Sequence, residues 1–306
     1  MFSIIFQHRS GGRLSTPDFF QQDHAAIEAA LEKLLPPEAA PPASIHRAMR
    51  YSVFAGGKRI RSILCYESAK LFSSDPASAI PVGCALEFIH TYSLIHDDLP
   101  ALDNDDLRRG KATNHKVFGE AIAILAGDAL LTLAFQTLAN SAIEPARRVR
   151  VISEIGAAAG TINGMVGGQV ADIEAEKKPA DAAMLEYIHR SKTAALICGS
   201  IVAGAIAGGA TDEDVERLRR FGQQIGWAFQ VVDDILDVSE SSAALGKTAG
   251  KDQAQQKATY PALYGLGKSR EIANDLETKA LRELDCYGQR ATRLRQLAQF
   301  VVARRN

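Results

Sequence analysis

The segment that decides the fold is Cys84–Asp106, CALEFIHTYSLIHDDLPALDNDD, in which an apolar run ends in five aspartates. The apolar residues of its first half recur at three- and four-residue spacing, which is typical of an α-helix. Polar residues are too few there for a helix on a protein surface. The segment therefore predicts a helix that runs through the interior of the fold and presents carboxylates at its end.

The same spacing recurs along most of the chain and predicts an all-α protein. No stretch of useful length alternates apolar and polar residues as a half-buried strand does. Proline and glycine residues separate the helical segments, and no linker or repeat divides the chain. We expect one bundle of about ten or more helices over residues 21–306, after a disordered leader over residues 1–20. The predicted segments are 26–35, 44–55, 78–97, 119–139, 145–160 and 212–236.

The composition argues against some partners and favours one compartment. The chain has 306 residues, a formal net charge of −1 and no stripe of basic residues, so we expect no nucleic acid partner. The four cysteines lie far apart and lack the spacing of a zinc site. We expect them to be reduced, in a cytoplasmic protein.

The uncharged run Thr193–Thr211 is a membrane candidate by length. It is rich in alanine and glycine and is flanked by Lys192 and Asp212, so we expect a buried bundle helix and no membrane partner. A ridge of small residues on one helix face is predicted before it, because glycine recurs at every fourth position. These glycines are Gly156, Gly160, Gly164 and Gly168.

A second helical segment, Trp227–Asp252, also ends in carboxylates. Asp233 and Asp237 are four residues apart and project from one face, whereas Asp234 lies about 100° aside. Two such helix ends facing each other across a cavity would repel unless cations lay between them. Carboxylates without histidine or cysteine suit Mg²⁺, which completes its shell with water and substrate phosphates. The pattern predicts a phosphorylated substrate.

The first acidic cluster cannot act from a regular helix. Asp97 and Asp103 are six residues apart, about 240° around a helix, which puts Asp103 on the wrong side. We expect Pro100 to break the helix and the following loop to bring Asp103 back.

Short basic groups accompany both acidic clusters. GGKRIR (56–61) follows a helix end, and Arg108 and Arg109 follow the first cluster. Lys192 opens the uncharged run, and Lys247 and Lys257 follow the second cluster. Cations beside two carboxylate clusters predict a site for diphosphates bridged by Mg²⁺.

Taken together, these motifs resemble those of the trans-isoprenyl diphosphate synthases. HDDLPALDNDDLRRG and QVVDDILD resemble the two aspartate-rich motifs, and GGKRIRS, MVGGQVADIE, HRSKTAAL and ATYPALYG follow the family order. The resemblance is greatest to bacterial farnesyl/geranyl diphosphate synthases, because four residues separate the first Asp pair from the last Asp. One departure is Ser62, where the family usually has proline. The resemblance implies an isoprenoid-synthase bundle with a central active-site cavity, and a homodimer.

The resemblance also implies roles for individual residues. Three Mg²⁺ ions per active site would be held by Asp97, Asp98, Asp103, Asp233, Asp234 and Asp237. The allylic diphosphate would be contacted by Arg108, Lys192 and Lys247, with Lys257 as a further substrate-binding cation. Isopentenyl diphosphate would be held by Gly57, Lys58, Arg61, His90 and Arg109. The reacting region would be lined by Gln169, Thr193 and Gln230, and the catalytic group would be Arg108, Lys192, Thr193 and Gln230.

These roles imply a head-to-tail condensation in which the allylic diphosphate leaves, isopentenyl diphosphate attacks the cation and a proton is lost. Tyr92 lies five residues before Asp97, about 7.5 Å back along a helix, with Ser93 beside it. A ring there would stop the growing chain, so we expect farnesyl diphosphate (C15) as the main product.

Other functions remain open at this stage. Geranyl (C10) or geranylgeranyl (C20) diphosphate would need only a different pocket depth. A class I terpene cyclase, a squalene-synthase-like enzyme, a non-catalytic regulatory subunit and a plain metal-binding helical protein are rivals of other kinds. The basic groups at 56–61 and Arg108–Arg109 argue against a cyclase, which needs no second diphosphate pocket.

Overall fold

The computed structural model describes residues 18–176, 181–239 and 259–303. α1 (Asp18–Leu34) begins before the predicted domain boundary at residue 21, and Phe20 is already buried in the core. The rest of the predicted leader, residues 1–17, lies outside the described residues.

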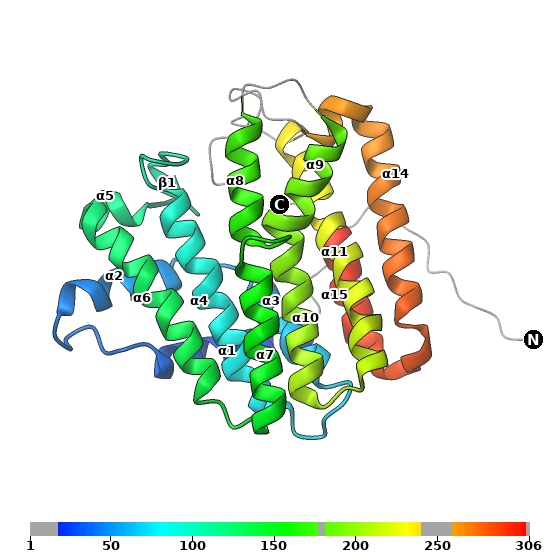
Figure 1. Cartoon of the computed structure of the whole chain (residues 1–306), viewed down its shortest axis with the longest axis horizontal. Helices are drawn as coiled ribbons and strands as arrows, with labels where there is room; N and C mark the ends of the chain where they lie inside the picture. The colour runs from blue at the N-terminus through cyan, green and yellow to red at the C-terminus, as the bar shows by residue number, and fades with distance from the viewer. Residues whose placement is uncertain (1–17, 177–180, 240–258, 304–306) are drawn as a thin grey trace, which may run out of the picture.

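The all-α prediction is confirmed: helices of similar direction surround a central one, as Figure 1 shows. After α1 come α2 (Ala43–Val53), α3 (Ile60–Ala69), η1 (Pro76–Ala79), α4 (Ile80–Asp97), α5 (Asn114–Phe118), α6 (Glu120–Ala139), α7 (Pro145–Ala159) and α8 (Met165–Ala175). Then follow α9 (Ala182–Ile188), the π-helical turn η2 (His189–Ala194), α10 (Ala195–Gly208), α11 (Asp212–Ser239), α14 (Tyr260–Glu283), η3 (Asp285–Ala291) and α15 (Thr292–Ala303). Within the described residues the only sheet is a short hairpin, β1 (Leu107–Arg108) with β2 (Lys111–Ala112).

Local sequence signals set several of the helix starts. Glu144 caps α7 by accepting hydrogen bonds from two backbone amides, and Pro145 occupies the first turn, where no amide donor is needed. Thr259 caps α14 in the same way, through the amide of Ala262. The second cap fixes where the chain re-enters the bundle beside α11, because the amide of the next residue, Tyr260, donates to Asp234.

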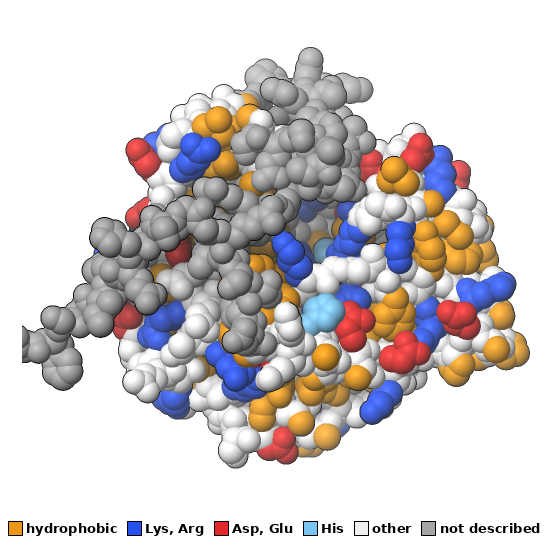
Figure 2. Space-filling model, turned by 180° about the vertical axis from the view of Figure 1, so that it is seen from behind, with side chains coloured by type: hydrophobic (Ala, Val, Ile, Leu, Met, Phe, Trp, Pro, Cys, Tyr) orange, Lys and Arg blue, Asp and Glu red, His pale blue; other side chains and the backbone are white. Residues whose placement is uncertain are grey.

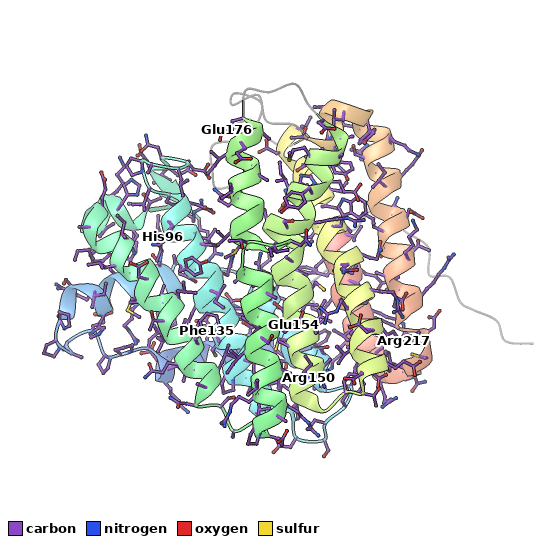
Figure 3. All side chains as sticks on the ribbon, in the orientation of Figure 1. His96, Phe135, Arg150, Glu154, Glu176 and Arg217 are labelled. Atoms are coloured by element: carbon purple, nitrogen blue, oxygen red, sulfur yellow. The ribbon has the colours of Figure 1, made fainter. Side chains whose placement is uncertain are left out.

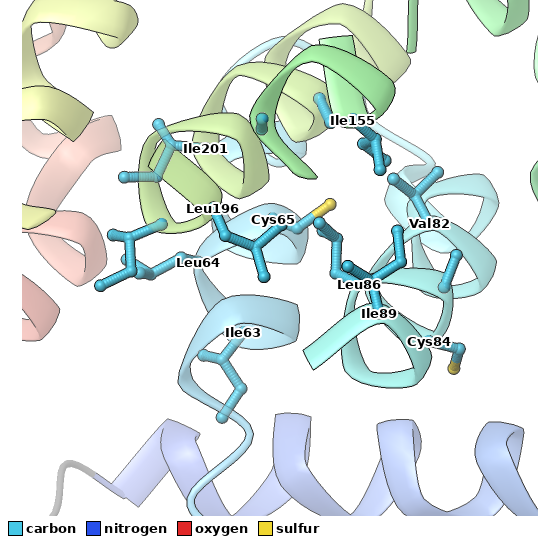
Figure 4. Packing of buried hydrophobic residues seen from close by; sticks show 14 of the residues in the cluster. Ile63, Leu64, Cys65, Val82, Cys84, Leu86, Ile89, Ile155, Leu196 and Ile201 are labelled. Carbon is cyan, nitrogen blue, oxygen red and sulfur yellow. The ribbon is translucent and has the colours of Figure 1, made fainter. Parts of the chain in front are cut away.

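The uncharged run predicted as a buried helix forms α10, and that prediction is confirmed. α10 packs against α3, α7 and α11, and its residues from Leu196 to Gly208 are all buried. A Cβ atom on Gly204 would collide with the carbonyl of Cys65, so the glycine lets α3 and α10 approach closely. Figure 4 shows the apolar side chains that fill this contact.

By length and composition, three helical stretches of the described chain could cross a membrane: Pro76–Asp97, Glu120–Ala139 and Ala182–Gly208. The last is 83% buried inside the bundle, whereas Glu120–Ala139 is only 39% buried. The burial of the first and last stretches identifies them as core helices. The apolar face of α6 is left uncovered by the described part of the chain.

The predicted glycine ridge is wrong. α7 ends at Ala159 and α8 begins at Met165, so Gly160 and Gly164 lie in the connection and do not share a helix face with Gly156. Gly168 has a different function, because a Cβ atom there would collide with the backbone of Lys192. Its role is to bring α8 against η2, at the side of the predicted site.

Candidate active site

The first acidic cluster is shaped by a loop that turns back on its own helix. α4 ends at Asp97, and the amide of Asp103 donates to the carbonyl of Asp97 at 2.8 Å. Asn104 follows with a φ of 51°, a left-handed conformation that asparagine tolerates. The predicted helix break and the return of Asp103 are therefore confirmed.

The charges of Asp103 and Lys192 both act on the carboxyl group of Asp97. Desolvation raises the pKa of Asp97 to about 6, Lys192 opposes this rise and the charge of Asp103 adds to it. Lys192 belongs to η2, on the other side of the site from α4. The structure thus brings Asp97, Asp103 and Lys192 together from distant parts of the sequence.

Asp98 is buried and already paired. Arg108 donates from Nε to Asp98 Oδ1 at 2.6 Å, and its Nη2 lies 2.6 Å from the same oxygen. Desolvation still raises the pKa of Asp98, although the guanidinium of Arg108 opposes the rise. The pair fixes the hairpin β1–β2 over the end of α4, and it orients Arg108 at the acidic cluster.

In the second cluster, Asp234 faces the protein interior. Its Oδ2 accepts a hydrogen bond from the amide of Tyr260 at 2.9 Å, and its Oδ1 accepts one from Gln230 at 3.2 Å. The ring of His189 lies 3.5 Å from Oδ2. Asp233 and Asp237, on α11, are both partly exposed. Asp234 therefore links α11 to α14 and η2, on a different side from Asp233 and Asp237.

A cavity of about 120 Å³ lies between α8, η2 and α11. Across it, Thr193 donates a hydrogen bond to Gln230 Oε1 at 2.8 Å, and Lys192 Nζ lies 2.7 Å from Asp172 Oδ2. Predicted residues in the lining are Lys192, Thr193, Gln230 and Asp234. The motifs around residues 192 and 230 therefore line one cavity.

The lining residues that the prediction did not include have Asp172 and His189 among them. Asp172 comes three residues after Gln169 in the sequence. If this segment is expected to be helical, both side chains lie on one helix face. Desolvation lowers the pKa of His189 to about 3, so this ring is neutral, and it stacks on Tyr260 at 5.2 Å. No sequence signal singled out His189, because its neighbours come from α11 and α14.

A third group of predicted residues forms a cationic cluster around His90. Desolvation lowers the pKa of His90 well below its ordinary value, and the charges of Arg61, Arg109 and Arg108 lower it further. A neutral imidazole surrounded by three guanidinium groups is a site that favours an anion. We call Arg61, Arg109 and His90 the arginine cluster; Arg108, which is paired with Asp98, is not counted in it.

Gly57 shapes this cluster by leaving space. Arg109 Nη1 donates a hydrogen bond to the carbonyl of Gly56, and a Cβ atom on Gly57 would lie 2.7 Å from that nitrogen. Gly57 also has a φ of 132°, which favours glycine. Lys58 extends to α15, where its ammonium group lies 5.6 Å from the centre of the Phe300 ring.

Three predicted residues near the end of α4 and on α8 have clear environments. Tyr92 is 8% exposed and makes an edge contact with His96, 5.7 Å between ring centres. His96, between α4 and α6 in Figure 3, lies 3.0 Å from the carbonyl of Ile124. Ser93 donates to the carbonyl of His90 at 2.9 Å, and Gln169 Oε1 is buried without a hydrogen-bond partner in the described structure. Lys247 and Lys257 lie outside the described residues.

No three histidine, cysteine or acidic side chains of the described residues converge closely enough to hold a metal ion by themselves. The donor set nevertheless fits Mg²⁺, which binds through few carboxylates and takes its other ligands from water and phosphate.

On the face in Figure 2, basic and acidic side chains are interspersed, which agrees with the lack of a basic stripe in the sequence.

The polyprenyl synthetase profile matches residues 42–299. A geranylgeranyl pyrophosphate synthase 7 of Arabidopsis thaliana is 52% identical over 87% of this chain and 78% of its own length. A dimethylallyltranstransferase of Fischerella ambigua is 48% identical over 94% and 83%. The solved geranyltransferase of Helicobacter pylori, complexed with magnesium and isoprenyl diphosphate, is 34% identical, with a TM-score of 0.80 over 95% of this chain and 98% of that one. The chain therefore belongs to the polyprenyl synthetase family of prenyltransferases.

Proposed function

We propose that this protein condenses isopentenyl diphosphate head-to-tail with an allylic diphosphate. The observation that carries the proposal is that basic side chains lie in two separate places, each of which could bind an anion. One is the arginine cluster, and the other lies where Lys192 meets Asp97. A terpene cyclase ionises a single diphosphate and has no use for the second site, so two sites favour a condensation.

The residues present fit Mg²⁺ as the cofactor at the acidic clusters. We assign the ligand role to Asp97, Asp103, Asp233 and Asp237, because the loop after α4 returns Asp103 to Asp97, and Asp233 and Asp237 share a partly exposed face of α11. Asp98 is paired with Arg108, and Asp234 binds Tyr260 and Gln230, so both position the site. Bound Mg²⁺ would supply positive charge to the departing diphosphate. The Helicobacter enzyme with magnesium supports this assignment, and three ions remain our prediction.

The chain's own residues would divide the chemistry between the two anion sites. Lys192 and Arg108 would bind the departing allylic diphosphate and stabilise the charge that develops on it. The hydroxyl of Thr193 and the amide oxygen of Gln230 are 2.8 Å apart and would face the allylic cation. Arg61, His90 and Arg109 would hold isopentenyl diphosphate for attack on that cation. The proton then lost can pass to the released diphosphate.

The product is proposed to be geranylgeranyl diphosphate, because the relatives with 52% identity carry that name. This differs from the farnesyl product expected from the sequence. One observation favours farnesyl as a second candidate: Tyr92 is buried against His96 one and a half turns before Asp97, where its ring would limit the chain. The two products differ by one five-carbon unit and are easily separated.

We also propose a homodimer, formed through the apolar face of α6. This face includes Ile124 at 44% and Leu125 at 53% exposure. A second copy with the same apolar face would cover it symmetrically.

The free cysteines, of which Cys65, Cys84 and Cys198 are buried, support a reducing compartment such as the cytoplasm.

Product analysis tests the proposed function directly. The protein is incubated with Mg²⁺, labelled isopentenyl diphosphate and dimethylallyl, geranyl or farnesyl diphosphate in turn, and the dephosphorylated alcohols are sized. Geranylgeraniol from all three substrates supports the C20 proposal, whereas farnesol from the first two alone supports the C15 candidate. Cyclic hydrocarbons, or no elongation, would overturn the proposed condensation.

A further inference from the structure

A buried polar network stabilises the segment 56–61, and the residues of this network have no assigned catalytic role. Arg59 lies between Lys58 and Arg61 in the sequence but is only 3% exposed. Its φ of 51° places it in the left-handed region, which is unfavourable for arginine. A charged side chain and a strained backbone at one buried position need specific partners.

Those partners come from three elements. Arg59 Nη1 donates to Glu87 Oε2 of α4 at 3.2 Å, and its Nε donates to Glu28 Oε1 of α1 at 2.6 Å. Its Nη2 donates to the carbonyl of Val53 at 2.6 Å. Val53 is the last residue of α2, and the segment 56–61 follows shortly after it. The guanidinium group thus fixes the segment to α1, α2 and α4 at once.

Ser62 is the third member of the network and contacts the second carboxylate oxygen of Glu87. The single hydrogen of its hydroxyl group faces two acceptors, Glu87 Oε1 at 3.1 Å and the carbonyl oxygen of Gly83 at 2.7 Å. Ser62 is fully buried and Glu87 is 3% exposed. Glu87 therefore has Arg59 on one oxygen and Ser62 on the other, and its rotamer is fixed between α3 and α4.

The network adjoins the arginine cluster along the chain. Arg59 and Ser62 flank Arg61 in the sequence, and Glu87 is three residues before His90 on α4, which is nearly one helical turn. The negative charge of Glu87 acts on Arg109, whose pKa is lowered chiefly by desolvation and raised by Glu87. Glu87 is thus a carboxylate that balances the cations without occupying the anion site itself.

We propose that Ser62, Glu87 and Arg59 are positioning residues that set the affinity of the arginine cluster for isopentenyl diphosphate. The inference rests on the proposed function, in which that cluster holds the non-allylic diphosphate. Ser62 matters because it fixes Glu87, and Glu87 matters because it fixes Arg59 and with it the direction of Arg61. Loss of the hydroxyl group lets Glu87 turn and the segment 56–61 drift from His90.

The test is steady-state kinetics of Ser62→Ala with each substrate varied separately. We expect KM for isopentenyl diphosphate to rise about fivefold, the factor that corresponds to loss of one ordinary hydrogen bond. KM for the allylic diphosphate and kcat should change less than about twofold, because Lys192 and Arg108 are untouched. Glu87→Gln, which keeps the shape and removes the charge, should raise the same KM further.

Ser68→Ala is the matched control. Ser68 lies on α3 as Ser62 does, is fully buried, and donates to the carbonyl of Ile201 at 2.8 Å. It should lower the melting temperature as Ser62→Ala does and leave both KM values unchanged. A melting change without a selective rise in KM for isopentenyl diphosphate in Ser62→Ala overturns the positioning role. A wild-type protein that does not elongate any allylic substrate overturns the proposed function instead, and this inference with it.

Discussion

Lys192 Nζ lies 2.7 Å from Asp172 Oδ2, and this ion pair joins η2 to α8 at the wall of the active-site cavity. The pair is largely shielded, with the Lys192 side chain 27% and the Asp172 side chain 16% exposed. Gly168 makes it possible, because α8 without a side chain there can lie against the backbone of Lys192. The ammonium group that we propose to bind the leaving diphosphate is thus held in place by Asp172.

Asp172→Asn is expected to lower kcat about tenfold, which corresponds to roughly 1.4 kcal/mol in the barrier. The amide keeps the shape of the carboxylate but no longer holds Lys192 by charge, so the ammonium group is less often aimed at the departing diphosphate. KM for isopentenyl diphosphate should stay constant. The measurement is kcat with a saturating allylic substrate.

Asp275→Asn serves as the control for that change. Asp275 forms an ion pair of the same length, 2.7 Å, with Lys279 on the exposed face of α14. Its loss should leave kcat unchanged, as is usual for surface pairs. An unchanged kcat in Asp172→Asn as well would mean that Lys192 needs no orientation from α8.

Gly57→Ala is expected to raise KM for isopentenyl diphosphate by about tenfold, or 1.4 kcal/mol of lost binding. The new methyl group would take the place of the Arg109 guanidinium, and the φ of 132° is unfavourable for alanine. Gly267→Ala, on α14 with open space around it, is the matched control and should leave KM unchanged. A normal KM in Gly57→Ala would show that Arg109 does not bind that substrate.

The helices, and the acidic ends of α4 and α11, could be predicted because they depend on the local spacing of apolar residues and on proline as a helix breaker. A helix that ends at Asp97 and a loop that returns Asp103 follow from the spacing of two aspartates around Pro100. The glycine ridge failed for a related reason. A four-residue period persists across a connection, so it cannot show that α7 ends before Gly160.

The parts of the site that the sequence did not reveal are those made by tertiary contact. The resemblance implies a metal ligand at Asp234, although its oxygens accept hydrogen bonds from Tyr260 on α14 and Gln230 on α11. His189 faces the same cavity because η2 is a π-helical turn, a local change of pitch that periodicity does not detect. Such roles depend on which helices meet, and no single segment contains that information.

Leu125→Glu is expected to convert a dimer into a monomer. A carboxylate on the apolar face of α6 would have to be buried without a partner if a second copy covered that face. The mass in solution is measured by light scattering after size-exclusion chromatography. Thr278→Glu, which adds the same charge to an exposed position on α14, should leave the mass unchanged. A Leu125→Glu protein of unchanged mass would place the interface elsewhere.

Tyr92→Ala is expected to lengthen the product by at least one five-carbon unit. The ring lies near Asp97, since desolvation and then the charge of Asp97 raise the pKa of the Tyr92 phenol. It also rests on His96, so its removal opens space along α4 below the acidic cluster. The dephosphorylated products of wild type and variant are sized side by side with the same allylic substrate.

Tyr66→Ala is the control for this last change, because it removes an aromatic ring from α3 where Lys70 covers it, 4.1 Å from the ring centre. Its product should match that of the wild type. If the wild type already makes geranylgeranyl diphosphate and Tyr92→Ala does not extend it, the pocket is closed by another side chain. If the wild type stops at farnesyl and the variant continues to geranylgeranyl, the depth of the pocket at Tyr92 decides the product.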